Sequence, residues 1–599
     1  MGPVLAMSGT GGGDPVWARF DDLGTGGASF LLSDLSAELV AHTPSAVAGV
    51  LRAAERAARE GHWVAGYVSY EAAPGLDPTL PSVGWPAGHP LASLPLVWFG
   101  VFDRRDEVPP PLTAPETAGG PVWELDRDRP WHAGAVAGIQ EDIAAGEYYQ
   151  LNLTARLTGS VPDPVGLYGA LAAAQGGRHN ALIVTPEHTV VSASPELFFT
   201  AEAGRVTTRP MKGTAPRGRW TGEDLEKREA LRTSPKERAE NVMIVDLLRN
   251  DLSRIAAVGS VEVPALFDTE RYPTVWQLTS TITASSRQDV NLPEIFAALF
   301  PSGSVTGAPK RASMQAIARI EERPRGVYCG AIGYLRPDPD RPGARFSVAI
   351  RTITRENRSG YAEYGSGGAI TSSSDPDFEW AELLTKTAVL SATPRPDRLL
   401  ETLRFEPPAT LVNLSRHLDR LASSAEYFGI DLDPEAVDGA LAAALEGRGS
   451  PARVRIVLDR LGASVRVEAT DLPAGGGVVS LGIAGEPVSS ADVLLFHKHG
   501  DRGRYDRFRE AGGDVDDVVL WNERREVTET TIANLAVQVD GRWWTPKLSS
   551  GLLPGVERGR LLEAGELAER VILLDELLAA PALAVVNSLR GWRPAKLRV

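Results

Sequence analysis

Cysteine is nearly absent from this chain of 599 residues, which contains one thiol, Cys329. A single cysteine excludes an internal disulfide framework and any zinc or iron–sulfur site that needs several thiolates. Long hydrophobic runs are missing as well, because the longest apolar stretches, such as ALAAAL at 440–445, fall far short of the ~20 residues of a membrane span. We therefore expect a reduced, cytoplasmic protein that does not enter a membrane.

The chain has fewer basic than acidic residues. The chain has 62 Lys and Arg against 77 Asp and Glu, which gives a net charge of −15. Because a nucleic-acid-binding surface neutralises phosphates with basic side chains, this balance argues against nucleic acid as a partner. The first residues, MGPVLAMSGTGGGDP, lack the charged and apolar regions of a secretion signal. The 43% of hydrophobic residues and the mixed charge are typical of a globular enzyme.

The chain divides into two blocks. Residues 44–60 carry apolar positions at helical spacing, and WVAGYVSY after them alternates like a strand. The Pro-rich segment 104–120 predicts a surface loop. In SATPRPDR at 391–398, two prolines end the preceding helix. We therefore predict one domain at 1–390, a linker at 391–398 and a second domain at 399–599.

Chemically informative segments concentrate between Gly146 and Lys386. Glu379, Glu382 and Lys386 share one helix face at i, i+3 and i+7. Taken singly, such a face is usually solvated, and a lone lysine in a loop usually points to water. In order, the segments are YQLNLT (149–154), SASPELFF (192–199), the Gly/Pro-rich loop RPMKGTAPRG (209–218), the helical RAENVMIVDLLRNDL (238–252), FPSGSVTGAPK (300–310), VYCGAIGYL (327–335), AIRT (349–352), YGSGGAI (364–370) and EWAELLTK (379–386).

Together, in this order, these segments resemble the chorismate-utilising enzymes: anthranilate synthase large subunit, aminodeoxychorismate synthase component I, isochorismate synthase and salicylate synthase. The resemblance implies that Glu240 and Glu382 hold a Mg²⁺ that grips the ring carboxylate of chorismate, with Glu379 as an outer ligand. Such sparse carboxylate ligation fits Mg²⁺, which completes its shell with water and substrate. The resemblance also implies substrate contacts from Thr306, Gly307, Tyr328, Arg351, Gly365, Gly367 and Lys386.

Lys212 separates the members of this family. Anthranilate synthases carry Ala in the corresponding PIAGT motif, aminodeoxychorismate synthases carry Lys in PIKGT, and this chain has PMKGT. The resemblance implies that the neutral Lys212 amine attacks C2 of chorismate as the C4 hydroxyl leaves, and that ammonia then displaces the lysine at C4. Glu196 matches the acid that protonates the hydroxyl, a role that needs a carboxyl kept protonated by burial. Isochorismate and salicylate synthases, which use a lysine here as the base for water, are the alternative.

The ammonia needs a source. A glutaminase would need a nucleophilic cysteine on a Gly-x-Cys-x-Gly turn, whereas Cys329 lies in VYCGAIG, in a strand-like segment. We therefore expect a separate glutamine amidotransferase partner, or direct use of ammonium.

The second block resembles the fold-type IV pyridoxal-phosphate enzymes, which include D-amino-acid and branched-chain aminotransferases and 4-amino-4-deoxychorismate lyase. The resemblance implies that Lys498 is the Schiff-base lysine and that Tyr505 follows it in the site. It also implies that Glu529 pairs with the pyridinium nitrogen and that Arg420 binds the phosphate. Its segments are NLSRHLDRLASSAEYFGI (413–430), VLLFHKHGDRGRYDRFRE (493–510), REVTETTIANLAV (525–537) and TPKLSSGLLPGVERGRLL (545–562).

Three positions depart from the lyase pattern. The lyases usually have Thr-Thr after the lysine, whereas this chain has His499 and Gly500. After the LLPG-Val turn they usually have Thr, whereas Glu557 stands here, and a carboxylate beside a phosphate is repulsive. These departures predict weaker cofactor binding.

The two resemblances fit each other, since aminodeoxychorismate made by the first block is the substrate of the lyase. We expect an α+β chorismate-utilising fold with two antiparallel sheets around the site, followed by a two-subdomain α/β fold of type IV. The fused enzyme would make 4-aminobenzoate for folate or a specialised metabolite. Two alternatives stay open for the second block: an amino-acid aminotransferase, or a degenerate docking module without catalysis.

Overall fold

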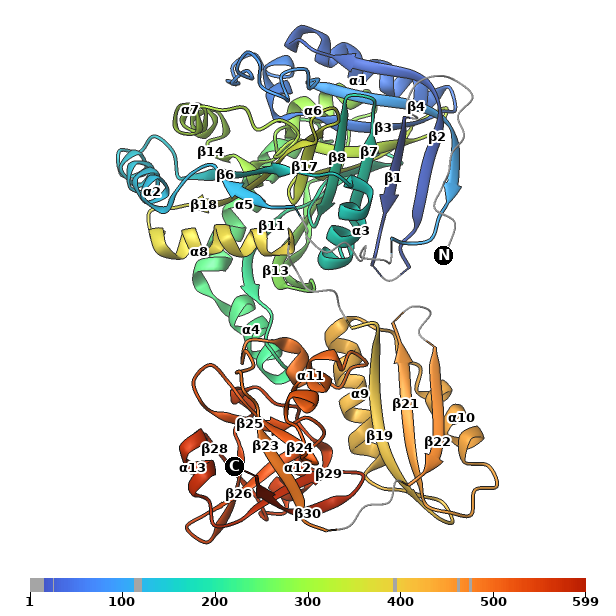
Figure 1. Cartoon of the computed structure of the whole chain (residues 1–599). Helices are drawn as coiled ribbons and strands as arrows, with labels where there is room; N and C mark the ends of the chain where they lie inside the picture. The colour runs from blue at the N-terminus through green and yellow to red at the C-terminus, as the bar shows by residue number, and fades with distance from the viewer. Residues whose placement is uncertain are drawn as a thin grey trace. The chain divides into compact units, whose positions relative to one another are not determined.

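The computed structural model describes residues 16–24, 26–111, 121–390, 396–460, 464–472 and 477–598 (Figure 1). The chain forms two compact units: Met1–Arg217 with Arg228–Pro394, and Gly218–Lys227 with Arg395–Val599. Most of the predicted linker, residues 391–395, lies outside the described residues, and so does the part 112–120 of the predicted loop.

The first unit is mostly β-sheet with helices on its outer faces. Its helices are α1 (Pro44–Arg59), α2 (Arg129–Ala144), α3 (Pro164–Gln175), α5 (Pro235–Ser253), α6 (Leu292–Leu299), α7 (Lys310–Glu321) and α8 (Pro376–Thr387), and α4 (Thr221–Thr233) spans the boundary between the units. Its strands are β1 (Trp17–Asp21), β2 (Ser29–Ala41), β3 (Trp63–Val68), β4 (Val97–Glu107), β5 (Trp123–Leu125), β6 (Gln150–Ser160), β7 (His179–Val184), β8 (His188–Ser194), β9 (Leu197–Glu202), β10 (Arg205–Arg209), β11 (Met211–Pro216), β12 (Glu262–Arg271), β13 (Val275–Ser285), β14 (Gly307–Ala308), β15 (Ala331–Arg336), β16 (Gly343–Val348), β17 (Thr352–Glu356) and β18 (Tyr361–Ile370).

The strands of the first unit form one continuous hydrogen-bonded set of 18, which divides into two antiparallel sheets joined where β2 pairs with β4. One sheet runs β5–β6–β18–β17–β8–β7–β1–β2, and the other runs β4–β3–β15–β16–β9–β10–β13–β12, with β2 paired to β4. Ala18 and Ile183 of the first sheet share one buried cluster with Ala65 and Ile332 of the second. The two sheets therefore pack face to face, as predicted.

Helices cover the outer faces of these sheets because their apolar residues recur at helical spacing. On α1, Val47, Leu51, Ala54 and Ala58 are buried against the second sheet, while the arginines between them face solvent. Figure 1 shows α1 beside β4 and α3 beside β7 and β8. Within this scaffold, the β6–β18 strand pair, strand β11 and helices α5 and α8 form the walls of a cavity.

The second unit has two sheets, each with its own helices. Its helices are α9 (Leu414–Phe428), α10 (Pro434–Leu445), α11 (Gly503–Ala511), α12 (Val556–Glu563) and α13 (Leu574–Ala579). One sheet is antiparallel in the order β20 (Thr410–Leu411), β19 (Arg398–Glu406), β21 (Ala452–Asp459) and β22 (Val465–Asp471). The other is mixed in the order β25 (Val527–Thr530), β24 (Asp517–Trp521), β23 (Val479–Ile483), β30 (Gly591–Leu597), β29 (Leu583–Asn587), β26 (Asn534–Val539), β27 (Arg542–Pro546) and β28 (Ala568–Arg570).

Strand β21 shows how the smaller sheet separates its faces. Val454, Ile456 and Leu458 point to one side and pack against α9 and α10. Since neighbouring side chains of a strand alternate between faces, Arg453 and Arg455 point to the other side, where both line a cavity.

A short segment from early in the chain completes the second unit. Trp220 packs on Phe496 with ring centroids 5.2 Å apart, and Tyr427 Oη donates to the Gly218 carbonyl at 2.6 Å. Arg219 donates to the carbonyls of Ser490 and Ser549, each at 3.1 Å. The predicted boundaries did not include this segment in the second domain.

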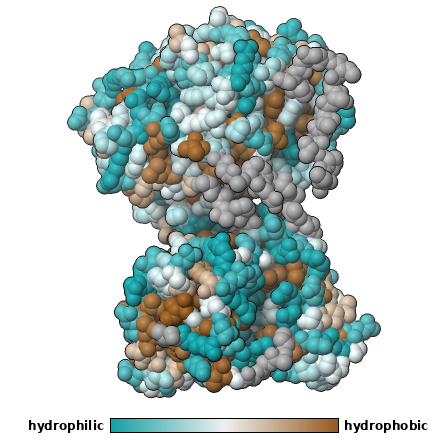
Figure 2. All heavy atoms as spheres, in the orientation of Figure 1, coloured by the Kyte–Doolittle hydropathy of each residue, from teal (hydrophilic) through white to brown (hydrophobic). Residues whose placement is uncertain are grey.

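The surface of the protein is mixed in character. Figure 2 shows hydrophilic residues interspersed with smaller hydrophobic patches on the face in view. Among the described residues, no helix has the length and apolar content needed to cross a bilayer.

Candidate active sites

Most of the residues predicted for the first site line one cavity of about 150 Å³. The predicted residues in its wall are Glu196, Lys212, Glu240, Tyr328, Arg351, Gly365, Gly367, Glu379, Glu382 and Lys386. They come from segments up to 190 positions apart, which the β6–β18 edge and helices α5 and α8 bring together.

Both helices that supply carboxylates are fixed at their N-termini. Ser234 accepts a hydrogen bond from the Glu237 amide at 3.4 Å and caps α5, six residues before Glu240. Asp375 accepts from the amides at 377 and 378, at 3.0 and 2.9 Å, and caps α8. The helical spacing then places Glu379 and Glu382 on the cavity side.

Lys212 lies on strand β11 and not in a loop. Its Nζ is 3.4 Å from Oε2 of Glu240, and its carbonyl accepts from Asn241 Nδ2 at 3.3 Å. β11 pairs with β13 on both sides of a register shift, and Gly213 lies in the shift with φ of +108°. A side chain at 213 would also come within 2.9 Å of Glu237, so only glycine fits beside the lysine. The Gly/Pro content that suggested a loop belongs to this bulged strand.

Glu196 is a buried carboxyl with a raised pKa. It lies between β8 and β9, and only 3% of its surface is exposed. Burial raises its pKa to about 7, against the opposing effects of hydrogen bonds from Ser304 and from the Met211 amide and of the Lys212 charge. The carboxyl therefore keeps a proton at neutral pH in much of the population, as a general acid requires.

Cationic and anionic side chains lie close together in this cavity. The Lys386 ammonium is 2.6 Å from Glu382 and lowers the pKa of that carboxyl. Burial and the neighbouring charge of Glu382 raise the pKa of Glu379, and burial and Glu240 do the same for Glu237. The carboxylates are therefore in surplus on the side that the two helices share.

These carboxylates fit a Mg²⁺ ion. Among the described residues, no three His, Cys, Asp or Glu side chains are close enough to hold a metal alone. A Mg²⁺ bound by Glu240 and Glu382 would therefore need water and substrate oxygens as its other ligands, which is the usual ligation of this ion.

Thr306 and Gly307 lie behind the cavity wall. Thr306 is fully buried and donates to the Ser302 carbonyl at 3.0 Å, and Gly307 pairs with Leu151 in the β14–β6 ladder. Ser304 and Val305, from the same small-residue loop, line the cavity instead. The structure thus brings the predicted loop to the site through its neighbouring residues.

The glycines of β18 leave room for the Tyr328 ring and the Leu153 carbonyl to pack closely against the strand. A Cβ on Gly365 would lie 2.4 Å from the Tyr328 ring, and a Cβ on Gly367 would lie 2.3 Å from the Leu153 carbonyl. The Lys386 ammonium donates to the Gly367 carbonyl at 2.8 Å. Arg351, whose backbone has a left-handed φ of +53°, donates to the carbonyl of Lys386.

A buried arginine connects three segments around this cavity. Arg325 forms two hydrogen bonds with Glu321, at 2.6 and 3.0 Å, and donates to the carbonyls of Val305 and Asn152 at 2.8 and 2.9 Å. Glu71 accepts from the Arg325 amide at 2.7 Å. The guanidinium therefore fixes two stretches of backbone whose side chains line the cavity.

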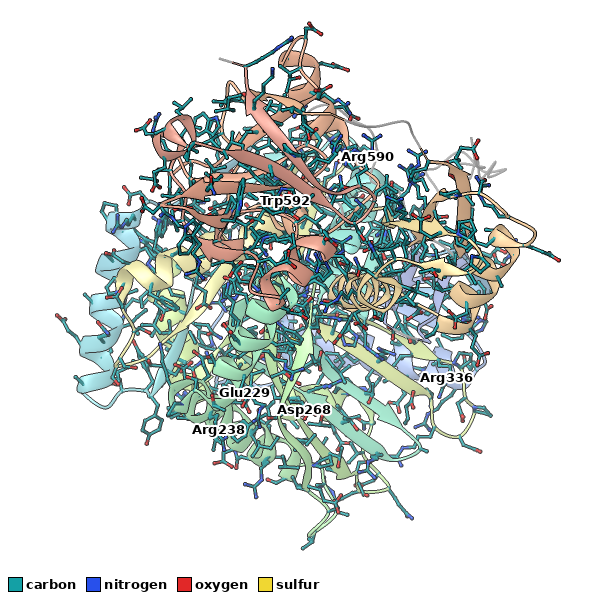
Figure 3. The ribbon with its side chains drawn as sticks, turned by 90° about the horizontal axis from the view of Figure 1, so that it is seen from below. Glu229, Arg238, Asp268, Arg336, Arg590 and Trp592 are labelled. Carbon is teal, nitrogen blue, oxygen red and sulfur yellow. The ribbon has the colours of Figure 1, made fainter. Side chains whose placement is uncertain are left out.

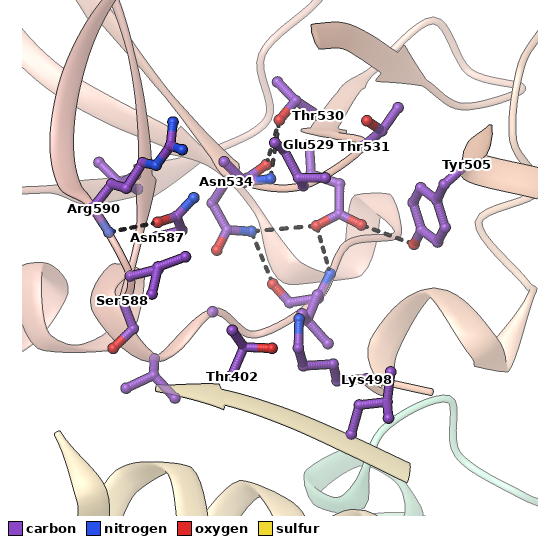
Figure 4. Close-up of a pocket in the computed structure, with 18 of the residues that line it drawn as sticks. Thr402, Lys498, Tyr505, Glu529, Thr530, Thr531, Asn534, Asn587, Ser588 and Arg590 are labelled. Atoms are coloured by element: carbon purple, nitrogen blue, oxygen red, sulfur yellow. Dashed lines mark hydrogen bonds between the residues drawn. The ribbon is translucent and has the colours of Figure 1, made fainter. Parts of the chain in front are cut away.

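The second unit contains a larger cavity of about 660 Å³. All four residues predicted for this site line it, namely Arg420, Lys498, Tyr505 and Glu529. Figure 4 shows Lys498 directed toward Glu529, with Tyr505 on the other side of the carboxylate.

Glu529 is held by three hydrogen bonds. It accepts from Tyr505 Oη at 3.1 Å, from the Leu553 amide at 3.2 Å and from Asn534 Nδ2 at 3.5 Å (Figure 4). Burial raises its pKa to about 8, so the carboxylate form lacks a sufficient cationic partner. Burial also lowers the pKa of Lys498 to about 8, and the charge of Arg420 acts in the same direction.

Arg420, on helix α9, lies in the wall of the same cavity. It forms two 2.8 Å hydrogen bonds with Glu401 and donates to the Pro554 carbonyl at 3.0 Å. His417, on the same helix, is 2.8 Å from Ser588 Oγ through Nε2. The Arg420 guanidinium, the Ser588 hydroxyl and the first amides of α12 offer donors of the kind that bind a phosphate.

The Glu557 carboxylate is turned away from these donors. Arg560 donates to it at 3.0 and 3.1 Å, and Asn413 donates at 3.2 Å. Gly555 and Val556 line the cavity, but Glu557 does not. The predicted repulsion of a phosphate is therefore reduced by these bonds.

The donor set of this cavity fits pyridoxal phosphate: a lysine, a buried carboxyl whose pKa is raised by burial, and an arginine. Gly555 is required there, because a Cβ would lie 1.8 Å from Asn534 Oδ1. Gly500 has a similar reason, since its Cβ would lie 2.2 Å from the Arg398 side chain. His499 lines the cavity, and its buried Nδ1 has no hydrogen-bond partner among the described residues.

Sequence reasoning missed several residues in both walls. In the first cavity these are Asn152, Lys236, Glu237 and Ser304, and in the second they are Arg455, Asn534, Ser588 and Arg590. The helical spacing between Glu237 and Glu240 was a usable signal. Ser588 and Arg590, by contrast, lie in a turn that carries no periodic pattern.

Comparison with known proteins assigns a family to each part of the chain. Residues 28–392 match the family model of the chorismate binding enzymes, and because this match spans more than half of the chain, the chain belongs to that family. Residues 398–597 match the amino-transferase class IV family, so the chain joins both families, and the match implies pyridoxal phosphate in the second unit. The predicted fold classes of the two blocks are thereby confirmed.

Individual relatives cover the first unit. An aminodeoxychorismate synthase from Streptomyces griseus is 41% identical over 315 residues, which are 52% of this chain and 42% of the relative. Aminodeoxychorismate synthase component 1 from Escherichia coli (strain K12) is 36% identical over 265 residues, which are 44% of this chain and 57% of the relative. The chain thus spans less than two thirds of the length of these relatives.

A solved structure shows the same fold in the first unit. The crystal structure of anthranilate synthase component I from Streptococcus pneumoniae TIGR4 matches with a TM-score of 0.52 at 22% identity, over 65% of this chain and 95% of that one.

Proposed function

We propose that the first unit converts chorismate and ammonia to 4-amino-4-deoxychorismate, and that the second unit converts this product to 4-aminobenzoate and pyruvate. One observation carries the proposal: Lys212 lies in the cavity wall with the buried acid Glu196 and the carboxylates of α5 and α8. The relatives named aminodeoxychorismate synthase support the same assignment.

In the first reaction the neutral Lys212 amine attacks C2 of chorismate. Both ring double bonds shift, the C4–O bond breaks, and Glu196 gives its proton to the departing hydroxyl, which leaves as water. Ammonia then attacks C4, both double bonds shift back, and the C2–N bond to Lys212 breaks. Two displacements account for retention of configuration at C4.

The cations of the cavity hold the substrate during these steps. Arg351 and Lys386 are placed to bind carboxylates, since both line the cavity and are fixed by backbone carbonyls or carboxylates. Mg²⁺ held by Glu240 and Glu382 would neutralise the ring carboxylate of chorismate.

The ammonia comes from a separate glutamine amidotransferase or from free ammonium. Cys329 is buried, and burial raises the pKa of its thiol to about 12, so it does not supply the thiolate that a glutaminase needs. The relative from Escherichia coli is named as component 1, which agrees with a second component.

In the second reaction Lys498 takes the proton from C4 of the amino compound. Its pKa of about 8 leaves part of the population neutral and able to act as a base. Pyridoxal phosphate, when bound, supplies an electron sink conjugated to the substrate amine. The C3–O bond then breaks, enolpyruvate leaves, and the ring becomes aromatic, which makes the step strongly favourable.

The experiment is to incubate the whole chain with chorismate, Mg²⁺, pyridoxal phosphate and ammonium and to separate the products by chromatography. We expect 4-aminobenzoate and pyruvate in equal amounts, with no need for a keto acid. Glutamine alone should give no product. If anthranilate, isochorismate or salicylate forms instead, the assignment of the first unit is wrong.

Supplying aminodeoxychorismate directly tests the second unit separately. A lyase releases pyruvate from this compound alone, whereas an aminotransferase needs an added keto acid. Release of neither pyruvate nor 4-aminobenzoate, together with no amino transfer to an added keto acid, would identify the second unit as a docking module.

A further inference from the structure

The cavity of the second unit has a surplus of positive charge that a phosphate alone does not use. Arg420 lies at the proposed phosphate end, and the rest of the wall is still strongly basic. Its cationic side chains are Arg420, Arg453, Arg455, Lys498, Arg502, Arg509, Arg590 and Arg593, against the carboxylates of Asp501, Asp516 and Glu529.

Two of these arginines come from strand β21 in the smaller sheet. The alternation of the strand directs Arg453 and Arg455 to the cavity, opposite the apolar face that packs on α9 and α10. Arg455 Nε is buried and has no hydrogen-bond partner among the described residues. Arg453 Nε donates to Thr470 Oγ1 at 3.3 Å. An unused donor at the buried Arg455 Nε favours a ligand that can pair with it.

Another two come from the β29–β30 hairpin in the larger sheet. Arg590 lies in its turn and Arg593 on β30, and both line the cavity. Figure 4 shows Arg590 beside Asn587 and Ser588 in the cavity wall, and Figure 3 shows it together with Trp592 of the same hairpin. Burial lowers the pKa of Arg593, and the charge of Arg590 acts in the same direction, against the opposing charges of Asp516 and Asp517. Since burial and Arg590 outweigh these carboxylates, a ligand anion would stabilise the charged pair further.

We propose that these two arginine pairs, Arg453 with Arg455 and Arg590 with Arg593, bind the two carboxylates of a dianionic substrate and make the second unit selective for dicarboxylates. The inference rests on the proposed lyase function and adds the residues that choose the substrate. It fits aminodeoxychorismate, which carries one carboxylate on the ring and one on the enolpyruvyl group.

The selectivity follows from the hydrogen bonds to arginine that a monocarboxylate cannot make. An arginine fork binds a carboxylate through two charge-assisted hydrogen bonds. A substrate with a single carboxylate can make only half of these charge-assisted hydrogen bonds, and sites built to pair two charged groups reject the incomplete ligand strongly. We expect the unit to prefer dicarboxylates to matched monocarboxylates by about 10²-fold.

Binding of isophthalate and benzoate tests this directly, because the two ligands differ by one carboxylate and neither can react. Calorimetry would use the whole chain carrying Arg351→Gln, which weakens anion binding in the first unit. Isophthalate should bind at least tenfold more tightly than benzoate. Arg455→Gln and Arg590→Gln should each remove most of that difference. The matched control is Arg466→Gln, since Arg466 on β22 is exposed and pairs with Asp459 at 2.9 Å, outside the cavity.

Pyruvate release from aminodeoxychorismate gives the second measurement. Arg455→Gln and Arg590→Gln should raise KM about tenfold or more, whereas Arg466→Gln should leave it unchanged. Equal affinity for isophthalate and benzoate, or unchanged affinity in both cavity variants, would overturn the proposal even if pyruvate release is normal. Absence of pyruvate release by the wild type would instead refute the lyase function, and the calorimetry would still decide the selectivity.

Discussion

Lys212 lies 3.4 Å from the carboxylate of Glu240, whereas Lys498 is buried and lies among both cations and carboxylates. Burial lowers the pKa of Lys498 to about 8; the charge of Arg420 acts in the same direction, and the charges of Glu401 and Glu529 oppose it. The two lysines that we propose as catalytic therefore differ in their surroundings. Lys212 pairs with one carboxylate, whereas burial dominates the environment of Lys498.

Exchanging each lysine for alanine is the strongest test of this comparison. Lys212→Ala should reduce formation of aminodeoxychorismate on the order of 10³-fold, because no nucleophile remains, and should leave pyruvate release from supplied aminodeoxychorismate intact. Lys498→Ala should do the reverse and should also remove the near-visible absorbance of the bound cofactor. Each variant is the control for the other, and loss of both activities in either one would contradict two independent sites.

The pH dependence of the two reactions should differ in sign. Glu196 must be protonated to act, and its raised pKa keeps the proton until the pH passes about 7, so the first reaction should decline above that pH. Lys498 must be neutral, so the second should increase as the pH rises toward about 8. Glu196→Gln should lower the first rate about 10²-fold and flatten its profile. If both rates changed with pH in the same direction, the proposed roles of Glu196 as an acid and Lys498 as a base would be contradicted.

Arg325→Gln should destabilise the first unit by about 3–5 kcal/mol, since it leaves buried Glu321 without its partner. Arg319→Gln is the matched control: Arg319 lies on α7, as Glu321 does, is largely exposed and pairs with Asp142, so about 0–1 kcal/mol is expected. Urea unfolding followed by tryptophan fluorescence and circular dichroism measures both. Similar small losses would show that Arg325 does not hold the cavity backbone together.

The smallest effect should be in the metal requirement. Glu240→Gln or Glu382→Gln should raise the Mg²⁺ concentration for half-maximal formation of aminodeoxychorismate about tenfold, since each removes one of two proposed protein ligands. Asp246→Asn, on an exposed part of α5, should not. The second reaction should be insensitive to EDTA. A first reaction that also survives EDTA unchanged would end the magnesium proposal.

Local spacing predicted the elements better than it predicted the cavity walls. The helix with Glu379 and Glu382 and the helix with Glu240 could be placed from periodicity, because helical geometry fixes which side chains share a face. Lys212 was predicted in a loop, because Gly and Pro residues suggest turns more often than a bulged strand. Whether Ser304 or Thr306 faces the cavity depends on one turn of backbone, which no periodic pattern specifies.

The second site shows the same limit. The position of Glu557 predicted a repulsive contact, but Arg560, three residues later on α12, turns the carboxylate aside. Arg455 and Arg590 lie about 135 positions apart in sequence and meet only through the packing of two sheets. Composition could not reveal this pairing, because the chain as a whole is acidic.

The segment Gly218–Lys227 has a consequence for the order of folding. It follows Lys212 closely in the chain, yet the side chain of Trp220 packs on Phe496, which is synthesised more than 270 residues later. During translation, Trp220 cannot pack on Phe496 until the last third of the polypeptide has been synthesised. A polypeptide cut near residue 390 would leave Trp220 uncovered in one fragment and Phe496 in the other. The second unit can therefore fold completely only together with a segment that is synthesised before the linker.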